Sequence, residues 1–259
     1  MAVSWDDGAG RETGRPEIVQ PDQDKEYRRL LFAAEVYHQF SPKLGAGIVL
    51  PYADVHLEDN AAGTEGDSSG LGDIRVYGLW SPWEDEEPNE FFDLANLTFI
   101  FGLTLPTATD VLPDLPVGRD GQLGGASLDV RLGATYWGNL SESWALFANL
   151  NLLLDTGADY TGYRNAPAFS GRVGIGFTPA KQVSMYASFR AMWSGPNHDS
   201  TGDVSNTGGT FLHVVPGIVV RPIPQLWFDA QGSFPVFHDV RGDQVLAGMT
   251  FTFGVTFTW

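Results

Sequence analysis

Single charged residues recur inside stretches of alternating polar and apolar residues, and these side chains are the most able to act on a solute. If the polar positions face a common interior, guanidinium and carboxylate groups gather there and can select anionic or polar molecules. The same groups could instead pair across neighbouring strands and fill a narrow interior, and the sequence leaves both alternatives open. The candidate pore-lining residues are Glu35, Asp73, Arg75, Asp129, Arg131, Arg172, Arg190, His213, Arg221 and Asp229, with Asp155 as a further inward-facing acid.

Catalytic and metal-binding chemistry has little support in the sequence. The chain has no Cys, which removes disulfides, thiolate metal ligands and Cys nucleophiles. His198-Asp199 and His238-Asp239 could bind a cation, but polar loop residues in contact with water are the more common case. We therefore expect no enzyme activity, no bound metal and no cofactor. The remaining His residues are equally scattered and form no close pair: His38, His56 and His213.

The alternation that carries the charged residues is clearest at the C-terminus. Met249, Phe251, Phe253, Val255, Phe257 and Trp259 occupy one parity, and Thr or Gly occupies the other. This period of two is typical of a β-strand with one continuous aromatic face. We count eleven such stretches and find no convincing amphipathic helix. The other ten are 30–40, 44–55, 74–80, 95–105, 128–137, 144–154, 169–177, 183–193, 212–220 and 226–234.

The connections between these stretches alternate between short and long. Short ones cover 41–43, 138–141, 178–181 and 221–224, with a longer acidic one at 81–90; long polar ones cover 58–70, 106–123, 156–165, 195–208 and 238–244. Short turns at one end and long loops at the other are typical of bacterial outer-membrane barrels. Trp and Tyr residues near the strand ends fit the aromatic belts of such barrels.

A soluble β-sandwich or a lipocalin-like barrel is the competing interpretation, since its strands alternate in the same way. It would bury the aromatic parity of eleven strands in one core and expose the other parity to water. That other parity carries Gly, Ser, Thr, Asn, Gln and isolated charges, in place of the Lys and Glu that solubilise an exposed sheet. We therefore favour the membrane barrel.

The strand count gives a more detailed prediction. Counting back from Trp259 at the short-turn end places the start of the eleventh strand, near Arg28, at the long-loop end. Single-chain bacterial barrels have even strand numbers, so one more strand should precede Arg28, within 2–7 or 12–20. The fold class predicted is all-β: a single antiparallel transmembrane β-barrel of twelve strands, with short periplasmic turns and long extracellular loops. Residues 1–27 would form an acidic first strand or plug, and residues 28–259 the barrel.

Composition narrows the partners. The net charge is −17, from 15 Lys and Arg against 32 Asp and Glu, and only 18% of residues are charged. An acidic protein repels phosphates, so nucleic acid is not an expected partner. The first residues lack the basic start and apolar run of a secretory signal, so we expect a mature form that lacks its signal peptide.

Several segments together resemble an outer-membrane barrel family named for the meta-pathway of phenol degradation. They are 70–77 (GLGDIRVY), 102–107 (GLTLPT), the hairpin 40–47 leading to Leu50-Pro51-Tyr52, and the terminal strand 248–259. The resemblance implies a Gram-negative bacterial outer membrane and the passage of small or hydrophobic molecules. Phe257 and the closing Trp259 also resemble the C-terminal signal read by the barrel-assembly machinery.

The predicted function is a monomeric outer-membrane channel or facilitator for passive uptake of small, hydrophobic or aromatic molecules. Its expected partners are outer-membrane lipid, lipopolysaccharide, the barrel-assembly machinery and a small-molecule solute. The alternative is a non-conducting structural barrel that docks a periplasmic or surface partner, for which the acidic turn 84–90 is the candidate contact.

Overall fold

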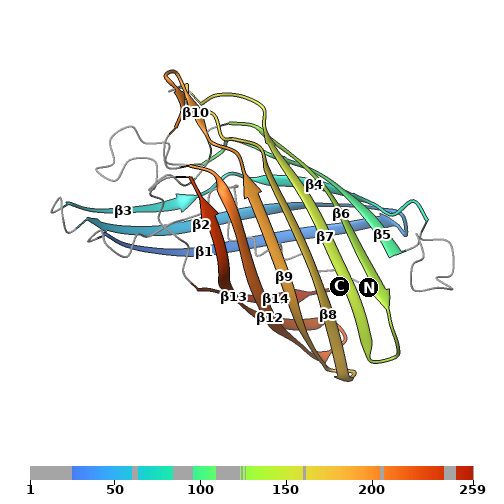
Figure 1. Ribbon diagram of the computed structural model, residues 1–259. Coiled ribbons are helices and arrows are strands. Elements are labelled where there is room, and N and C mark those ends of the chain that lie inside the picture. The colour runs from blue at the N-terminus through green and yellow to red at the C-terminus, as the bar shows by residue number, and fades with distance from the viewer. Residues whose placement is uncertain are drawn as a thin grey trace.

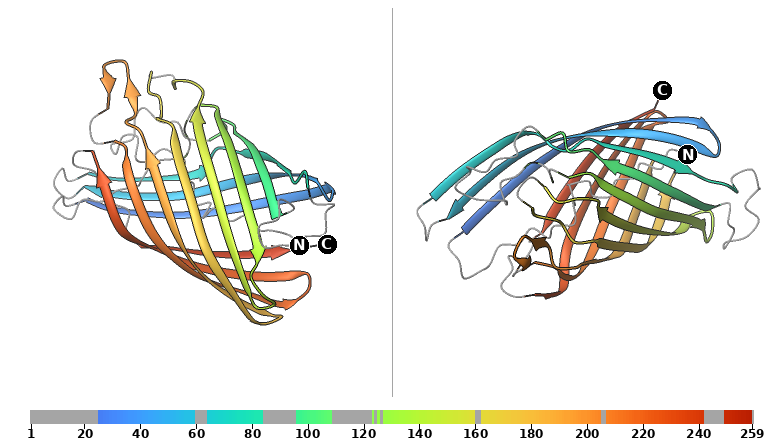
Figure 2. Two further views of the ribbon diagram at one scale, coloured as in Figure 1. Left: turned by 45° about the vertical axis from the view of Figure 1, so that its right-hand side comes forward. Right: turned by 90° about the horizontal axis from the view of Figure 1, so that it is seen from above.

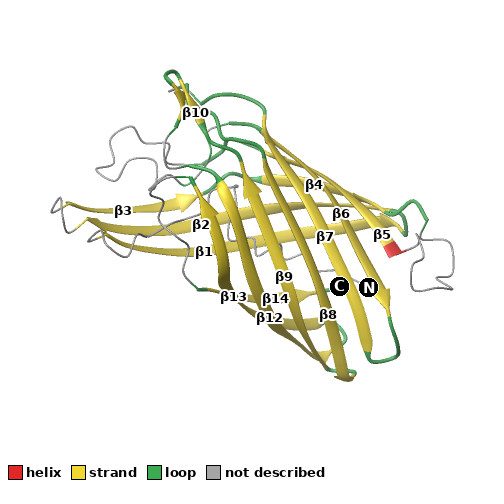
Figure 3. Ribbon diagram, viewed as in Figure 1, coloured by secondary structure: helices red, strands yellow, loops and turns green. Residues whose placement is uncertain are grey.

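The structure is a computed structural model that describes residues 25–59, 64–83, 96–108, 123, 125, 127–159, 162–204, 207–241 and 249–258. Strands make up most of this part of the chain (Figure 3). Within the described residues, no helix is long and apolar enough to cross a lipid bilayer. The strands are β1 (Lys25–Ser41), β2 (Leu44–Asp59), β3 (Thr64–Leu71), β4 (Arg75–Trp80), β5 (Leu97–Thr104), β6 (Asp129–Asn139), β7 (Trp144–Asp155), β8 (Ala168–Ala180), β9 (Val183–Ser194), β10 (His198–Asp199), β11 (Gly202–Asp203), β12 (Gly209–Ile223), β13 (Leu226–Val240) and β14 (Thr250–Phe257).

Twelve of these strands form one antiparallel sheet, which confirms the predicted fold class. Its order is β1-β2-β4-β5-β6-β7-β8-β9-β12-β13-β14, and β3 also pairs with β2. The sheet coils strongly, so that β1 and β2 run across behind β7–β9 in Figure 1, and the two turned views in Figure 2 show the same curvature. The short connections at 42–43, 140–143, 181–182 and 224–225 lie at one end of the sheet, which we call the turn end; the opposite end is the loop end.

The described sheet contains one strand, β3, that the sequence does not predict. β3 pairs with the loop-end half of β2, residues 52–59, in a region predicted as loop. Residues 2–20, which contain the predicted twelfth strand, lie outside the described part of the chain. Because β3 reads TEGDSSGL, it offers no apolar alternation, and the backbone ladder to β2 makes it a strand. β4 pairs with the turn-end half of β2, residues 44–49. β3 and β4 therefore lie one after the other along the same edge of β2.

Two other predicted loops contain regular structure. Residues 195–208 include the short hairpin β10–β11, and β13 runs on to Val240, so that His238 and Asp239 lie in a strand. The register of β12 against β13 shifts between Leu212 and His213, which marks a β-bulge at this point. Polar residues at the loop end therefore continue the strands beyond the apolar stretches that the sequence pattern detects.

The two faces of the sheet differ in polarity. On β14, Phe251, Phe253, Val255 and Phe257 are exposed, and Phe253 is 80% exposed. The aromatic parity therefore lies on the convex face, which excludes the soluble alternative that would bury it. A continuous apolar surface of this extent is the surface that a bilayer covers. Exposed Phe, Leu, Ile, Val, Met and Trp side chains extend it over the other strands, for example Phe32, Leu50, Phe101, Leu132, Leu150, Ile175, Phe189, Trp193, Ile218 and Phe228.

β1 and β14 end the strand order and run in the same direction. β1 ends at the first short turn, and Phe257 of β14 pairs with Leu226, the first residue after the last short turn. Two strands with the same direction cannot pair antiparallel, so an antiparallel closure requires a strand of opposite direction between them. This geometry supplies the structural reason for the predicted strand before Arg28, which stays a prediction.

Substitution on β14 tests the assignment of the two faces. Phe253→Arg should strongly reduce assembly, because an Arg on the lipid face costs about 2–4 kcal/mol near the bilayer midplane. Thr252→Arg should be tolerated, because Thr252 lies on the opposite face, opposite Gln231 of β13. The measurement is the folded fraction after refolding into vesicles, read from the mobility difference between unheated and heated samples on a denaturing gel. Equal tolerance of the two substitutions would contradict the assignment.

Candidate functional site

The charged residues of the sequence prediction lie on the face opposite the exposed aromatic side chains. That this face is concave follows from contacts that pass over an intervening strand. Tyr186 of β9 donates a hydrogen bond to Gln231 of β13 at 3.1 Å, and Arg172 of β8 reaches the same Gln231 oxygen at 3.4 Å. Since β12 lies between β9 and β13 in the sheet, these side chains meet over it on the inner side.

Strand register sorts the inner-face residues into rows that cross the sheet. One row, here called the mixed row, joins Glu35, Val49, Arg75, Thr104, Asp129 and Asp155 of β1, β2, β4, β5, β6 and β7. A second, here called the basic row, joins Asn149, Arg172, Arg190 and His213 of β7, β8, β9 and β12. Seven of the residues predicted to face inward therefore fall into two sets of cross-strand neighbours of different charge.

Several neighbouring side chains hold Arg172, a member of the basic row. Its Nε donates to Ser188 Oγ at 2.8 Å and its Nη2 to Gln231 Oε1. The guanidinium carbon lies 5.5 Å from the centre of the Phe147 ring and 5.3 Å from that of Tyr186, within the range of cation–π attraction. Four neighbouring side chains thus hold one cation at a defined place on the inner face.

The rings around Arg172 lie flat on glycines. A Cβ on Gly174 or Gly217 would collide with the ring of Phe147 or Tyr186, respectively. Phe147 also stacks on Trp137, with ring centres 5.7 Å apart and planes at 12°, and meets Tyr186 edge to face at 6.0 Å. Glycines opposite the aromatic residues therefore let three rings and one guanidinium pack against the wall.

A second aromatic group lies on the β1, β2 and β4 part of the inner face. The rings of Tyr37 and Tyr77 are parallel, with centres 6.4 Å apart, and they cover Gly45 and Gly47 of β2. Tyr77 donates its hydroxyl hydrogen to Glu35 Oε1. Glu35 is thus held by a phenol on the inner face.

The carboxylates at the loop end bind backbone amides. Asp73 is buried between β3 and β4, and its oxygens accept hydrogen bonds from the N–H groups of Thr107 and Ala108, both at 3.0 Å, and of Gly125. Asp155 accepts from the N–H groups of Gly157 and Asn165 in the same way. Both acids order loop segments over the wall, a role that the sequence analysis did not assign to them.

An apolar contact accompanies the Asp73 anchor. Leu123 packs against Ala53 and Val55 of β2, both 1% exposed, and Leu31 and Ala108 border this cluster. Burying a Leu side chain contributes about 1.5–3 kcal/mol, so the cluster helps to fix residue 123 on the inner face. The loop end of this part of the interior is consequently apolar, although the sequence analysis predicted only polar inner positions.

Of the three remaining predicted residues, Arg221 and Asp229 lie nearer the turn end. Arg221 Nη2 donates to the Pro224 carbonyl at 2.9 Å, and its guanidinium lies 4.5 Å from the Trp227 ring centre. Asp229 lies over Gly254 of β14. Arg221 therefore organises the last short turn. Arg131 lies between the two rows, opposite Gly102 and Leu153.

The candidate pore-lining residues were predicted from their charge. The neutral side chains that contact Arg172 were therefore missed: Phe147, Tyr186, Ser188 and Gln231. A usable signal was present, because Phe147 pairs with Gly174, and Tyr186 with Gly217, directly across the strands. An aromatic residue opposite a glycine on a polar strand face marks a ring that lies along the wall. Register, which the sequence alone does not supply, is needed to recognise it.

One sequence motif has the spacing of a hydrolase nucleophile. Residues 66–70 read Gly-Asp-Ser-Ser-Gly, the Gly-x-Ser-x-Gly pattern of a strand-to-helix elbow. Here the motif lies within β3, and Ser68 is 6% exposed opposite Val55 of β2. Ser68 therefore lies buried in an extended strand, whereas a hydrolase nucleophile of this motif lies on a sharp exposed turn.

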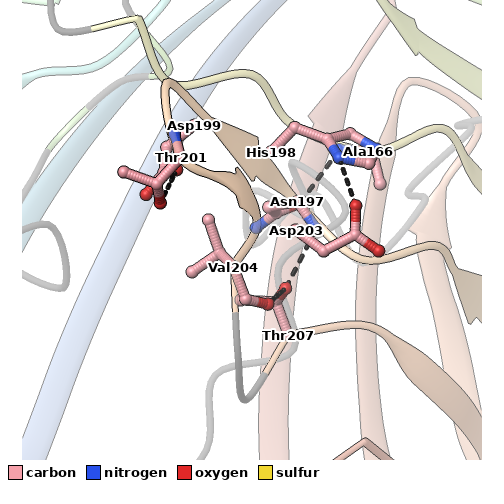
Figure 4. A network of polar contacts seen from close by, with 8 residues as sticks. All are labelled: Ala166, Asn197, His198, Asp199, Thr201, Asp203, Val204 and Thr207. Atoms are coloured by element: carbon pink, nitrogen blue, oxygen red, sulfur yellow. Dashed lines mark hydrogen bonds and ion pairs between the residues drawn. The ribbon is translucent and has the colours of Figure 1, made fainter.

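His198 of the β10–β11 hairpin contacts residues close to it in the chain (Figure 4). His198 Nδ1 lies 2.7 Å from Asp203 Oδ1 across β10–β11, while Asp199 accepts from the N–H and hydroxyl of Thr201. Asn197 ties the hairpin to Ala166 and Thr207. In the part of the chain that the structure describes, no three His, Asp or Glu side chains are grouped to hold a metal ion.

Comparison with known proteins gives a likeness in fold. The COG4313 outer membrane channel from Pseudomonas putida F1 resembles this chain with a TM-score of 0.67 and 16% identity, over 89% of this chain and 82% of that one. A FadL homologue from Pseudomonas aeruginosa gives a TM-score of 0.45 and 12% identity, over 90% and 68% of the two chains. No family model and no curated protein matches the sequence. The first comparison confirms the predicted fold, an outer-membrane type β-barrel, and the family suggested by the sequence motifs stays a prediction.

Neutralising Asp73 tests its anchoring role. Asp73→Asn should weaken the attachment of Thr107, Ala108 and Gly125 by roughly 1–3 kcal/mol, because an amide group cannot accept on both sides as the carboxylate does. Hydrogen exchange measured by mass spectrometry should then be faster in peptides covering these residues. Asp239→Asn is the matched control, since Asp239 is exposed in β13. Unchanged exchange in the Asp73 variant would show that the carboxylate does not hold the loop.

Proposed function

We propose that this protein is a Gram-negative outer-membrane channel that lets small molecules cross by passive diffusion. The observation that carries the proposal is the pairing of an apolar convex face with an inner face that bears two rows of ionisable side chains. The likeness in fold to the COG4313 channel supports it. The proposed partners are outer-membrane lipid, lipopolysaccharide and the barrel-assembly machinery, and the chain acts as a monomer.

The charged side chains of the inner face favour a water-filled interior. Arg75, Arg172 and Arg190 lie partly exposed on this face, and ionised side chains are costly to place in a dry core. A water-filled interior keeps their hydration at little cost, while the same groups on the convex face would meet hydrocarbon. The charged rows are therefore the feature that links the fold to solute passage.

The Arg172 group is the proposed point of solute selection along the route. A barrel of about twelve strands has little free interior once side chains are included. Trp137, Phe147, Tyr186 and Arg172 pack together on one side of that interior. We assign to this group the selection of solutes by size and ring shape.

The N-terminal segment has a defined place in this proposal. A strand that spans a bilayer needs about 9–11 residues, and residues 1–24 provide that length with some to spare. A strand formed by part of this segment, running opposite to β1 and β14, would close the sheet. The remaining residues are then available as a short plug.

Solute flux into vesicles tests the channel function. Vesicles containing the protein should swell in isotonic pentose or hexose solutions faster than lipid-only vesicles. Arg172→Ala should raise single-channel conductance in planar bilayers, because it removes a large side chain from the proposed point of selection. Arg221→Ala is the control, since it removes the same side chain from the inner face at the turn end.

A wild-type protein that is folded but shows neither swelling nor current would refute the proposal. Such a result would favour a structural barrel that docks a partner, with the acidic turn 84–90 as the segment to examine. That segment lies outside the described residues.

A further inference from the structure

Two tyrosine rings form a flat surface on the β1, β2 and β4 part of the inner face. Tyr37 of β1 and Tyr77 of β4 lie in register with Gly47 of β2, one on each side of it. The ring of Tyr77 covers Gly47, and the ring of Tyr37 covers Gly45. The two ring planes are within 5° of each other, and the ring centres are 6.4 Å apart. Because each ring lies over its own glycine, the rings lie side by side along the wall, and we call this surface the tyrosine platform.

Each platform ring directs one face into the interior. The opposite face lies on a glycine, so the ring rests on the backbone and not on another side chain. Both tyrosines are partly exposed to solvent. The face of an aromatic ring carries partial negative charge, which attracts electropositive hydrogen atoms of a ligand. A ring-shaped solute with C–H groups on its flat face can therefore lie on the platform.

Polar side chains border the platform along the strands. Glu35, two residues before Tyr37 on β1, is exposed to solvent and accepts the hydroxyl hydrogen of Tyr77. Arg75, two residues before Tyr77 on β4, is partly exposed, and Gln39 is exposed at the other end of the platform. Exposed polar groups exchange hydrogen bonds with water, and a solute hydroxyl can take the place of that water. The platform is thus apolar in its middle and able to form hydrogen bonds at its edge.

This combination suits a sugar ring better than an aromatic hydrocarbon. A pyranose carries C–H groups on its faces and hydroxyl groups around its edge, so it makes both kinds of contact at once. A planar hydrocarbon could stack on the tyrosines, but it would displace water from the polar edge without replacing the hydrogen bonds. A carboxylate also accepts a stronger hydrogen bond from a hydroxyl group than a neutral acceptor does.

We propose that the tyrosine platform is a binding site for the pyranose ring of a sugar. The C–H face of the sugar lies on Tyr37 and Tyr77, and one sugar hydroxyl donates to Glu35. The inference rests on the proposed channel function, because a solute reaches the platform from the interior, and it names a class of solute that pauses there.

Binding to the full chain in detergent micelles tests the platform without any need for conduction. The probe is methyl β-glucopyranoside, and the detergent is a polyoxyethylene ether, because detergents with sugar headgroups would compete. Saturation-transfer NMR, with protein-free micelles as the blank, should show saturable binding. Gly47→Ala should weaken it about three- to tenfold, because the added Cβ displaces the Tyr77 ring. Gly78→Ala is the matched control, since a Cβ at Gly78 meets only one atom at 3.9 Å, and it should leave binding unchanged.

Further variants test the carboxylate and the second ring. Glu35→Gln should weaken glucoside binding about fivefold or more, because the hydrogen bond to a charged acceptor is lost. Glu142→Gln, an equal change of charge in an exposed turn, should leave binding unchanged. Tyr37→Ser removes one ring without creating an overlap, and it should weaken binding at least about threefold. The gel-mobility test for folding is applied to every variant.

Two other solutes test the class of ligand. Sorbitol, which has hydroxyl groups but no ring, and nicotinamide, which has a planar aromatic ring, should both bind much more weakly than the glucoside. Absent glucoside binding to the folded wild type, or unchanged affinity in the folded Gly47→Ala, Tyr37→Ser or Glu35→Gln variant, overturns the inference. Equal binding of sorbitol overturns the ring contact, and equal binding of nicotinamide overturns the assignment to sugars. Vesicle swelling stays positive in all these cases if the channel proposal alone is correct, whereas glucoside binding without swelling or current refutes the channel proposal alone.

Discussion

Each strand of this sheet separates hydrocarbon from a polar interior, and this constraint determines most of what its residues can be. Because side chains alternate across a strand, one parity must satisfy lipid and the other must satisfy water or its own polar neighbours. Phe253 and Thr252 are adjacent in the chain yet meet opposite surroundings. A slip of one residue in register would move every Arg of β8 and β9 onto the lipid face, so the same alternation also fixes how the strands pair.

This constraint explains what the sequence could predict. For strands such as β9 and β14, the sequence predicts both the strand and which side chains face lipid, because apolar residues such as Phe, Met and Trp alternate with mostly polar residues or Gly. β3 was missed because its residues are polar or Gly on both faces apart from the terminal Leu71, and only its hydrogen bonds to β2 make it a strand. The last part of β13 was missed for a related reason: a bulge interrupts its register, and His238 and Asp239 read as a loop.

The site was predictable in its charges and not in its contacts. Alternation placed Arg172, Arg190 and His213 on the inner face, but their alignment in one row depends on the register of four strands. The contact between Tyr186 and Gln231 crosses over β12 and has no local sequence signature. Burial of Asp73 beneath backbone amides was equally hidden, because the N–H groups that it binds lie far away in the chain. The acids at the loop end therefore hold loop segments in place, whereas Arg172, Arg190 and His213 lie together on the inner face.

The ring of Tyr186 on Gly217 also limits how this protein can change over time. Any side chain at 217 collides with a tyrosine at 186, and a smaller residue at 186 leaves Gly217 uncovered and Gln231 without its phenol partner. The two positions can therefore vary only as a pair, although they lie on different strands and far apart in the chain. Phe147 and Gly174 form a second such pair. In an alignment of relatives, correlated substitution at these two pairs would reveal the register of β7, β8, β9 and β12 without a structure.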